Sequence, residues 1–509
     1  MIDRMTPLPS IDAAPAEIIA EHADTTNVIA VPLGKRVRSG VSWNASSSLV
    51  SQLLALLRTI VIARLLLPED FGLLGMALTI IAGLTALTTT GMDQSILAHK
   101  FADRDELRAQ LNTVWTAELL RSLVLTLLVV ACADPLARFY GQPRLRLIIL
   151  ILALSVLIQG WQNIGLVLLR KEISFARLFW YELACNAGGI VLTIGLVLAL
   201  RNVWGLVFGL LTSAVLSVSL SYCFHAYRPR LAFDKTALLR ALNFGKFALV
   251  IAVASYVTTM ADNVMVGRLL GTVALGNYAL AYNVASVPIG VLVYALGRVL
   301  FPAYAEIAAN RPQHLERAFI KVFTISSLIL TMIAVPMFLL AGELVRLLFG
   351  ERWTSAGPAL RVLTLIIPLR GLVLVVTTVF FGLNRPKHVA MGKMLEAVVF
   401  LALLYPLIIN LGLTGAAWAG VIAYALACIN RVLALREIIP GISSKLLRIS
   451  GSTLIAAAAG VLIGGLSLNF LESQLPRVMV AGLLSSVIPA LVLLLIRSDL
   501  RKWISDWSY

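Results

Sequence analysis

Four arginines lie inside long apolar runs of this sequence, where a charge needs a chemical reason. They are Arg58, Arg121, Arg298 and Arg370. A charged residue at the centre of a membrane helix costs about 2.5–3.5 kcal/mol on insertion scales, so it usually faces a polar cavity or a partner. A guanidinium can also bind two phosphate oxygens at once through its planar fork. Each arginine is therefore a candidate ligand for an anionic, phosphate-bearing group.

Arg370 and Arg58 are the favoured ligands. Arg370 lies about twelve residues from either end of its apolar run, and positions 366, 367, 373 and 374 carry no acid. A cavity role is favoured there over snorkelling to the interface, because the side chain has far to reach. Arg58 lies six residues before Arg64, or about 9 Å deeper by helix rise. It either binds a substrate phosphate or pairs with an acid.

The other polar candidates have structural explanations of similar weight. Glu118 lies three residues before Arg121 and can neutralise it within one helix, which is the favoured reading. Arg298, near the cytoplasmic end of its run, fits positive-inside anchoring as well as substrate capture. Trp161 and Gln162 could contact sugar rings, but polar groups in membrane helices also hydrogen-bond to neighbouring helices.

The composition decides the class of protein. Of 509 residues, 59% are hydrophobic and 13% are charged, whereas a soluble domain is roughly 45–50% apolar and about 25% charged. Too little polar surface is left to cover a water-soluble body, which excludes a soluble enzyme. The net charge of +16 fits basic cytoplasmic loops, and no basic run interleaved with aromatics indicates nucleic-acid binding. Four cysteines without CxxC spacing indicate packing roles.

Apolar windows of about 20 residues, enough to cross roughly 30 Å of hydrocarbon, predict an all-α polytopic membrane protein with about fourteen spans. The predicted spans are 43–66, 71–92, 112–133, 147–168, 178–200, 203–224, 245–267, 274–300, 319–341, 359–382, 389–409, 412–430, 450–469 and 478–496. Even-numbered connections and the termini carry 27 basic residues against 10 in odd-numbered connections. Both termini are therefore expected in the cytoplasm.

The connections leave no room for a catalytic domain. None exceeds about 25 residues, and GxxxxGK[ST], HExxH and CxxC motifs are missing from the sequence, so neither a nucleotide, a metal nor another cofactor is expected. Residues 1–40 form a polar tail without the apolar stretch of a signal peptide, and are expected to be a cytoplasmic arm. The sequence thus predicts a transporter and not an enzyme.

A short motif occurs twice with a constant offset of 204 residues. Arg64-Leu65-Leu66, Gly72 and Ala77 recur as Arg268-Leu269-Leu270, Gly276 and Ala281, and Arg138-Phe139-Tyr140-Gly141 has a looser echo at 346–350. Six predicted spans separate the copies, so the halves share one orientation. Such repeats are related by an axis along the membrane normal, with binding sites between the halves near the midplane. We expect lobes at 41–230 and 231–440, followed by two additional helices within 441–509.

The offset also relates two opposite charges. Adding 204 to position 58 gives Asp262, an acid deep in a predicted span without a local basic partner. The sequence therefore predicts either a gate, in which Arg58 and Asp262 pair on one side of the cycle, or a structural ion pair. Asp262 is also the candidate for ion coupling, with Glu118 as a second acid for gating.

The stretch Leu53–Gly72, together with Gly91-Met92-Asp93, resembles the bacterial polysaccharide-export flippases. These belong to the multidrug/oligosaccharidyl-lipid/polysaccharide exporter superfamily, and the resemblance covers about residues 40–500. It implies two six-helix lobes with two extra helices, alternating access, and an undecaprenyl-diphosphate-linked oligosaccharide as cargo. Residues 58–64 also resemble the first helix of lipid II flippases, whose matching arginine faces the cavity. That match implies that Arg58 is a substrate-phosphate ligand.

The expected function is a flippase of the bacterial inner membrane that moves lipid-linked oligosaccharide units for exopolysaccharide, capsule or lipopolysaccharide synthesis. Its expected partners are this glycan lipid, membrane lipids, and the polymerase and export proteins of the same pathway, but no nucleic acid. Energy would come from an ion gradient, the membrane potential or downstream consumption. The alternatives are a multidrug or organic-cation antiporter, whose cavity should be acidic, a lipid II flippase, and a membrane scaffold that transports nothing.

Overall fold

The computed structural model describes residues 50–496, apart from residues 90, 99–100, 102, 172–174, 311, 384 and 471–473. The predicted tail at 1–40 lies outside the described residues. A helix over residues 50–65 comes first. It is followed by α3 (Pro68–Thr88), α4 (Met92–Ala98), α5 (Arg104–Tyr140), α6 (Pro143–Gln159), α7 (Leu166–Lys171), α8 (Phe175–Leu200), α9 (Val203–Phe224), α10 (Lys235–Asn310), η2 (Pro312–His314), α11 (Leu315–Leu339), α12 (Ala341–Phe349), η3 (Glu351–Ala356), α13 (Gly357–Leu363), α14 (Ile366–Gly382), α15 (Pro386–Leu411), α16 (Leu413–Leu435), α17 (Ile442–Phe470) and α18 (Gln474–Ile496).

The described chain is all-α, without a strand among its residues. Nine of its helices are long and apolar enough to cross a membrane, or ten when Glu351–Leu363 and Ile366–Gly382 count as one bent span. The prediction of an all-α polytopic membrane protein is confirmed. The number of fourteen spans stays a prediction.

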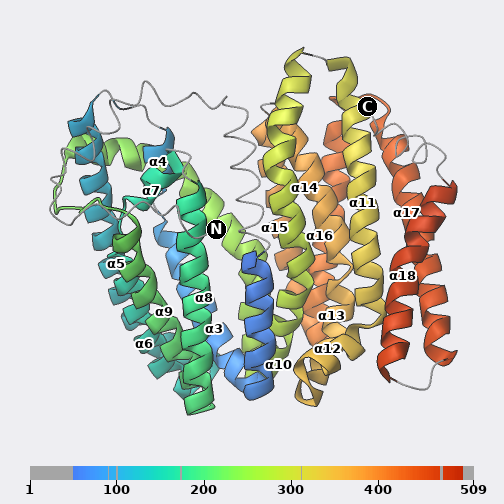
Figure 1. Cartoon of the computed structure of the whole chain (residues 1–509), viewed down its shortest axis with the longest axis horizontal. Coiled ribbons are helices and arrows are strands. Elements are labelled where there is room, and N and C mark those ends of the chain that lie inside the picture. The colour runs from blue at the N-terminus through green and yellow to red at the C-terminus, as the bar shows by residue number, and fades with distance from the viewer. Residues whose placement is uncertain are drawn as a thin grey trace, which may run out of the picture.

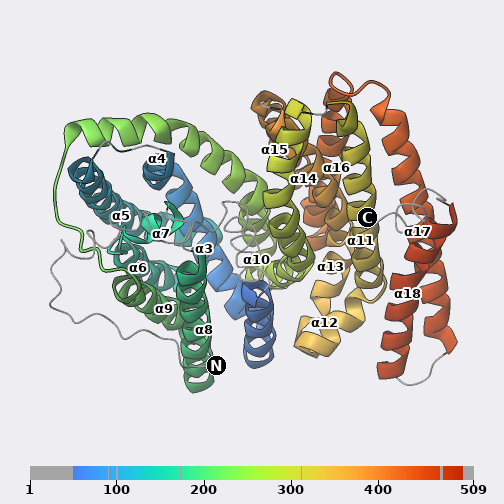
Figure 2. The ribbon, with the colours of Figure 1, turned by 45° about the horizontal axis from the view of Figure 1, so that its top comes forward.

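The helices form two groups that α10 joins. Figure 1 shows α3 to α9 on one side and α11 to α16 on the other, with α17 and α18 at the outer edge. Helices α17 and α18 pack on each other and on α11. Figure 2 shows the first part of α10 running across one end of the N-terminal group before the helix enters the other group. Within the pair of groups, α3 packs most extensively on α10.

Helix α10 is a hairpin of two arms and not one straight rod. Its backbone leaves the helical region at Gly271, where φ is +87°, a conformation that glycine adopts without a Cβ clash. The hydroxyl of Tyr278 lies 2.7 Å from a carboxylate oxygen of Asp262, although sixteen residues of straight helix would separate the two by about 24 Å. The chain therefore folds back at Gly271, as the predicted spans 245–267 and 274–300 require.

The prediction of one continuous span over 147–168 is wrong. Helix α6 ends at Gln159, and α7 starts only at Leu166. In the break between them, Asn163 accepts a hydrogen bond from the Gly165 amide at 2.9 Å and donates to the Tyr227 carbonyl at 2.7 Å. An asparagine side chain that bonds nearby backbone competes with helix formation. Trp161 and Gln162 thus lie in a turn and not in the middle of a helix.

The segment between α9 and α10 lies along α5 as an extended strap over residues 225–234. From residue 230 to residue 234, every second backbone N–H donates to a side chain of α5: Arg230 to Asn112, Ala232 to Thr116 and Asp234 to Thr113, at 3.0, 3.2 and 3.1 Å. The period of two matches an extended chain, whose successive N–H groups point to opposite sides. The strap fixes where the first arm of α10 begins.

The largest apolar core crosses from one group to the other. It contains Leu73 and Met76 of α3, Leu275 of α10 and Trp353 of η3, all of them buried. The groups are therefore held together at the end where α12 and η3 lie.

Candidate functional site

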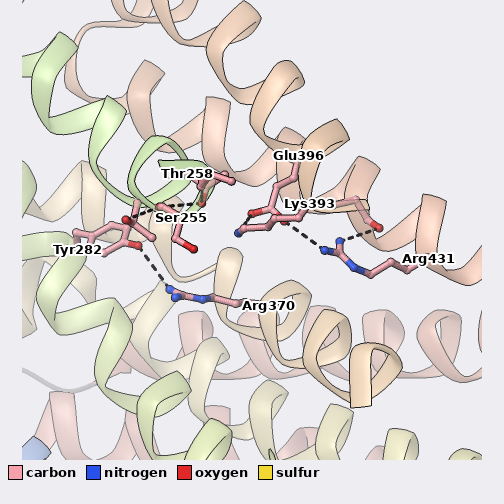
Figure 3. A network of polar contacts seen from close by, with 10 residues as sticks. Ser255, Thr258, Tyr282, Arg370, Lys393, Glu396 and Arg431 are labelled. Atoms are coloured by element: carbon pink, nitrogen blue, oxygen red, sulfur yellow. Dashed lines mark hydrogen bonds and ion pairs between the residues drawn. The ribbon is translucent and has the colours of Figure 1, made fainter. Parts of the chain in front are cut away.

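Arg370 lies one turn into α14 and is surrounded by tyrosines of other helices. Its Nη1 atom donates to the Tyr282 hydroxyl at 3.5 Å, and its guanidinium carbon is 5.9 Å from the centre of the Tyr424 ring. Figure 3 shows Arg370 and Tyr282 pointing toward each other. Aromatic and hydroxyl groups therefore surround the cation, and it forms no ion pair with an acid of the described residues.

A small cavity next to Arg370 brings two carboxylates of distant sequence together. It is lined by Thr258, Asp262, Tyr278, Tyr282, Ile366, Glu396, Phe400, Gly420, Ala423 and Tyr424. Asp262 is almost fully buried and accepts hydrogen bonds from the Tyr278 hydroxyl at 2.7 Å and the Asn263 amide at 2.9 Å. A buried carboxylate with neutral donors can exchange a proton or a cation, which suits the predicted coupling role.

The second carboxylate, Glu396, belongs to a buried charge cluster that the sequence analysis missed. Glu396 and Arg431 have side chains only 3% exposed and approach within 3.6 Å. Lys393 approaches the other oxygen of Glu396 at 2.7 Å, and Figure 3 shows these three charges in one row beside Arg370. The signal was the pair Lys393 and Glu396 inside the predicted span 389–409, three positions apart.

Arg58 is the second arginine that the sequence favours as a phosphate ligand. It is half-buried on the helix over 50–65, and no hydrogen bond or ion pair joins it to another described residue. Asp262 makes its described contacts with Tyr278 and Asn263, so the Arg58–Asp262 pair is not formed in this conformation. A guanidinium in a membrane helix without a described partner is available to an anionic ligand.

In the N-terminal group, Arg121 and Glu118 form the predicted intrahelical ion pair, with Nε 2.7 Å from a carboxylate oxygen. Asp93 of α4 and Arg170 of α7 lie within electrostatic reach of the same site. The cluster is therefore of mixed sign, and Arg121 is largely neutralised by its neighbours.

Trp161 and Gln162 have structural partners of their own. The Trp161 ring is half exposed and meets Trp115 edge-on at 6.1 Å, while Gln162 donates to the Tyr181 hydroxyl at 2.8 Å. No contact among the described residues joins them to the Arg370 cluster. Arg298 lies on α10, and its side chain is outside the described part. No three His, Cys, Asp or Glu side chains of the described residues are grouped so that they could hold a metal ion.

The comparisons with known proteins agree on one family. Residues 61–358 match the family model described as polysaccharide biosynthesis protein. The chain is 26% identical over 331 residues to the succinoglycan biosynthesis transport protein ExoT of Rhizobium meliloti, which covers 65% of this chain and 66% of that protein. It is 28% identical over 343 residues to the lipopolysaccharide biosynthesis protein WzxC of Escherichia coli, covering 66% and 68%. The matched segments thus span about two thirds of these relatives.

The fold has a solved counterpart. The lipid II flippase MurJ in its inward closed conformation superposes with a TM-score of 0.74 at 15% identity, covering 90% of this chain and 99% of that one. The helix arrangement is shared although few residues are. Since the family model covers more than half of the sequence, the chain belongs to the polysaccharide biosynthesis protein family, as a Wzx-like polysaccharide flippase of the multidrug/oligosaccharidyl-lipid/polysaccharide exporter superfamily.

Proposed function

We propose that this protein flips an undecaprenyl-diphosphate-linked oligosaccharide across the bacterial inner membrane by alternating access, for the synthesis of exopolysaccharide, capsule or lipopolysaccharide. The observation that carries the proposal is the family match over residues 61–358, since relatives named for succinoglycan transport and lipopolysaccharide biosynthesis share it. Both termini are proposed to lie in the cytoplasm, from the distribution of basic residues.

The membrane-embedded arginines give the proposal a site. Arg58 and Arg370 draw the diphosphate between the two groups of helices, because a guanidinium binds phosphate oxygens in pairs. The polyprenyl chain stays in the lipid, because moving its methylene groups into a polar cavity would cost free energy. Arg121, Arg298, Trp161 and Gln162 are proposed as secondary contacts to the headgroup, and Glu118 as a gating acid.

Energy coupling is proposed for the cavity around Asp262. Its carboxylate has neutral hydrogen-bond donors and no described ion pair, whereas Glu396 is already matched by Lys393 and Arg431. Uptake of a proton or cation by Asp262 changes the net charge beside Arg370, and this change can alter the affinity of Arg370 for an anion.

The test is the leaflet distribution of lipid-linked oligosaccharide after the protein is depleted from cells of its source organism. Wild-type protein should relieve a cytoplasmic accumulation, while Arg58→Ala and Arg370→Ala, expressed at normal levels, should fail. Arg361→Ala is the matched control, because Arg361 is an exposed arginine nine residues before Arg370. If both variants relieve the accumulation, the proposed arginine site is wrong, whereas the proposed flippase function still holds. If nothing accumulates and sensitivity to cationic drugs rises, the protein is a drug antiporter.

A further inference from the structure

The two copies of the repeated motif touch each other across the centre of the molecule. A methyl group on Gly72 would come within 1.8 Å of the Thr272 carbonyl oxygen, and one on Gly276 within 1.9 Å of the Pro68 carbonyl oxygen. Adding the offset of 204 to positions 68 and 72 gives 272 and 276, so each contact is the image of the other. This reciprocity is the property of a two-fold interface. Helix α3 and the second arm of α10 therefore cross on a pseudo-two-fold axis.

The arginines of the motif extend the same symmetry. Arg64 donates from Nε to the Leu348 carbonyl at 2.9 Å and from Nη2 to the Leu347 carbonyl at 2.5 Å, at the last turn of α12, where helix carbonyls lack a partner. Its equivalent, Arg268, places its guanidinium 5.3 Å from the centre of the Phe139 ring, in the last turn of α5. Each arginine thus reaches a helix C-terminus in the other half of the chain.

An aromatic ring of the C-terminal half also takes part in this contact. Trp353 of η3 is completely buried, donates from Nε1 to the Ala63 carbonyl at 2.8 Å, and meets the Phe71 ring edge-on at 4.9 Å. The buried indole therefore contacts both the helix over 50–65 and α3.

We propose that Arg64, Arg268, Gly72, Gly276 and Trp353 form a latch that holds the two halves closed at one side of the membrane and opens in each transport cycle. The connection that contains α12 lies between the predicted spans 319–341 and 359–382, which the positive-inside rule places at the periplasmic side. This inference rests on the alternating access proposed above. Two features of the latch would allow it to open. The arginines are exposed, so water can replace their contacts. The motif glycines have no side chains that would interlock across the contact.

The experiment measures the exposure of a residue that the latch covers. Thr272 is buried at the crossing point, so Thr272→Cys in the full-length chain, with the four native cysteines replaced by alanine, reports opening in lipid nanodiscs through its rate of reaction with a membrane-impermeant maleimide. Arg64→Gln should raise this rate about tenfold or more, because hydrogen bonds from a charged group are among the stronger ones. Trp353→Phe, which keeps an aromatic ring, should raise it about threefold or more, for loss of one neutral hydrogen bond.

Arg268→Gln should have a smaller effect, about two- to fivefold, because a solvent-exposed cation–π contact is weaker. Arg146→Gln is the control, since Arg146 pairs with Asp134 within one half, and should leave the rate unchanged. Unchanged labelling in both Arg64→Gln and Trp353→Phe would overturn the latch, as would an equal rise in Arg146→Gln. Should Arg64→Gln fail to fold, Arg64→Lys tests the same contact with the charge kept. Labelling does not depend on the cargo, so the latch and the proposed substrate can fail separately.

Discussion

At the scale of single residues, the C-terminal half contains a cluster of charged side chains that form ion pairs with one another inside the protein. Glu396 and Arg431 are each 3% exposed and 3.6 Å apart, and Lys393 shares the same carboxylate. Removing one member of a buried pair is expensive because it leaves the other charge uncompensated. Substituting different members of the cluster should therefore lower the stability of the protein by different amounts.

Glu396→Gln should destabilise the protein more than Arg431→Met. The first substitution leaves Lys393 and Arg431 without their carboxylate and should cost about 3–5 kcal/mol. After the second, Glu396 keeps Lys393 as a partner at 2.7 Å, so the loss should be clearly smaller. Thermal unfolding of the purified variants in one detergent gives the ranking. An equal or reversed order would mean that Lys393 and Arg431 do not share Glu396 as described.

His225 should make the strap sensitive to acid. Burial, with the nearby Arg177 and Arg228 charges, lowers the pKa of His225 to about 4, and its Nδ1 atom accepts the Tyr227 amide at 3.0 Å. The unfolded chain binds a proton below about pH 6.5, whereas the folded chain binds it only near pH 4. The stabilisation is therefore complete above about pH 6.5 and is lost as the pH falls from there toward 4.

Hydrogen exchange of residues 225–234 between pH 7.5 and 4.5, corrected for intrinsic rates, checks this expectation. His225→Asn is the control, because an asparagine oxygen can accept the amide two residues later without titrating. The strap of this variant should keep its protection at low pH. Equal acid sensitivity in both proteins would assign the effect to another group.

At the scale of elements, short turns fix the helices to one another. Between α8 and α9, Arg201 has a φ of +50°, and Asn202 caps α9 by accepting the Trp204 amide at 3.0 Å. The first backbone amide of α9, that of Val203, donates to Asp70 near the start of α3 at 3.1 Å. Asp70 also accepts a hydrogen bond from the Leu67 amide at 3.2 Å. One carboxylate therefore joins the N-termini of two helices.

Arg201→Gly should stabilise this turn. A non-glycine residue in the left-handed region costs about 1–2 kcal/mol, which glycine avoids, less its greater entropy when unfolded. The expected gain is about 0.5–1 kcal/mol, seen as a higher unfolding temperature. Arg201→Ala removes the same side chain but keeps the Cβ, so it should bring no gain. Stabilisation by both variants would show that the arginine side chain, and not the backbone, is the cause.

At the scale of the whole molecule, the pseudo-two-fold axis relates positions that are far apart in the sequence. Gly72→Ala and Gly276→Ala each force a methyl group onto backbone carbonyl oxygen of the opposite half. Backbone cannot move aside as a side chain can, so both should destabilise the protein by about 1–3 kcal/mol or more and lower transport together.

Gly75→Ala is the matched control in the same helix, because the nearest atom to its new methyl group would be a Leu275 side-chain carbon at 3.5 Å, an ordinary contact. Unfolding temperature and complementation of transport are the measurements. A strong effect at position 72 with none at 276 would contradict the reciprocal crossing.

The membrane class and most helices could be predicted because they depend on local properties. The apolar windows predict α3, α8, α9, α15 and α16. The break after Gln159 was missed, because it depends on Asn163 finding backbone partners in the strap sixty residues later. The four arginines inside predicted spans could be found because a charge in a membrane helix is energetically unfavourable. Arg431 could not, because it lies just beyond a predicted span, and its pairing with Glu396 is visible only in the structure.

The sequence is enough to predict that the protein lies in a membrane and is all-α, because the hydrophobicity of a segment is the sum over its residues. It also reveals the internal offset of 204, because repeated residues keep a constant spacing. Tertiary structure alone decided which face of each helix meets which neighbour. It brought the repeated glycines into reciprocal contact with backbone of the opposite half and placed Arg64 against the end of α12, and it gave Asp262 a tyrosine partner in place of Arg58. The physical reason is that contacts across helices depend on their rotation and crossing, to which distant residues contribute equally.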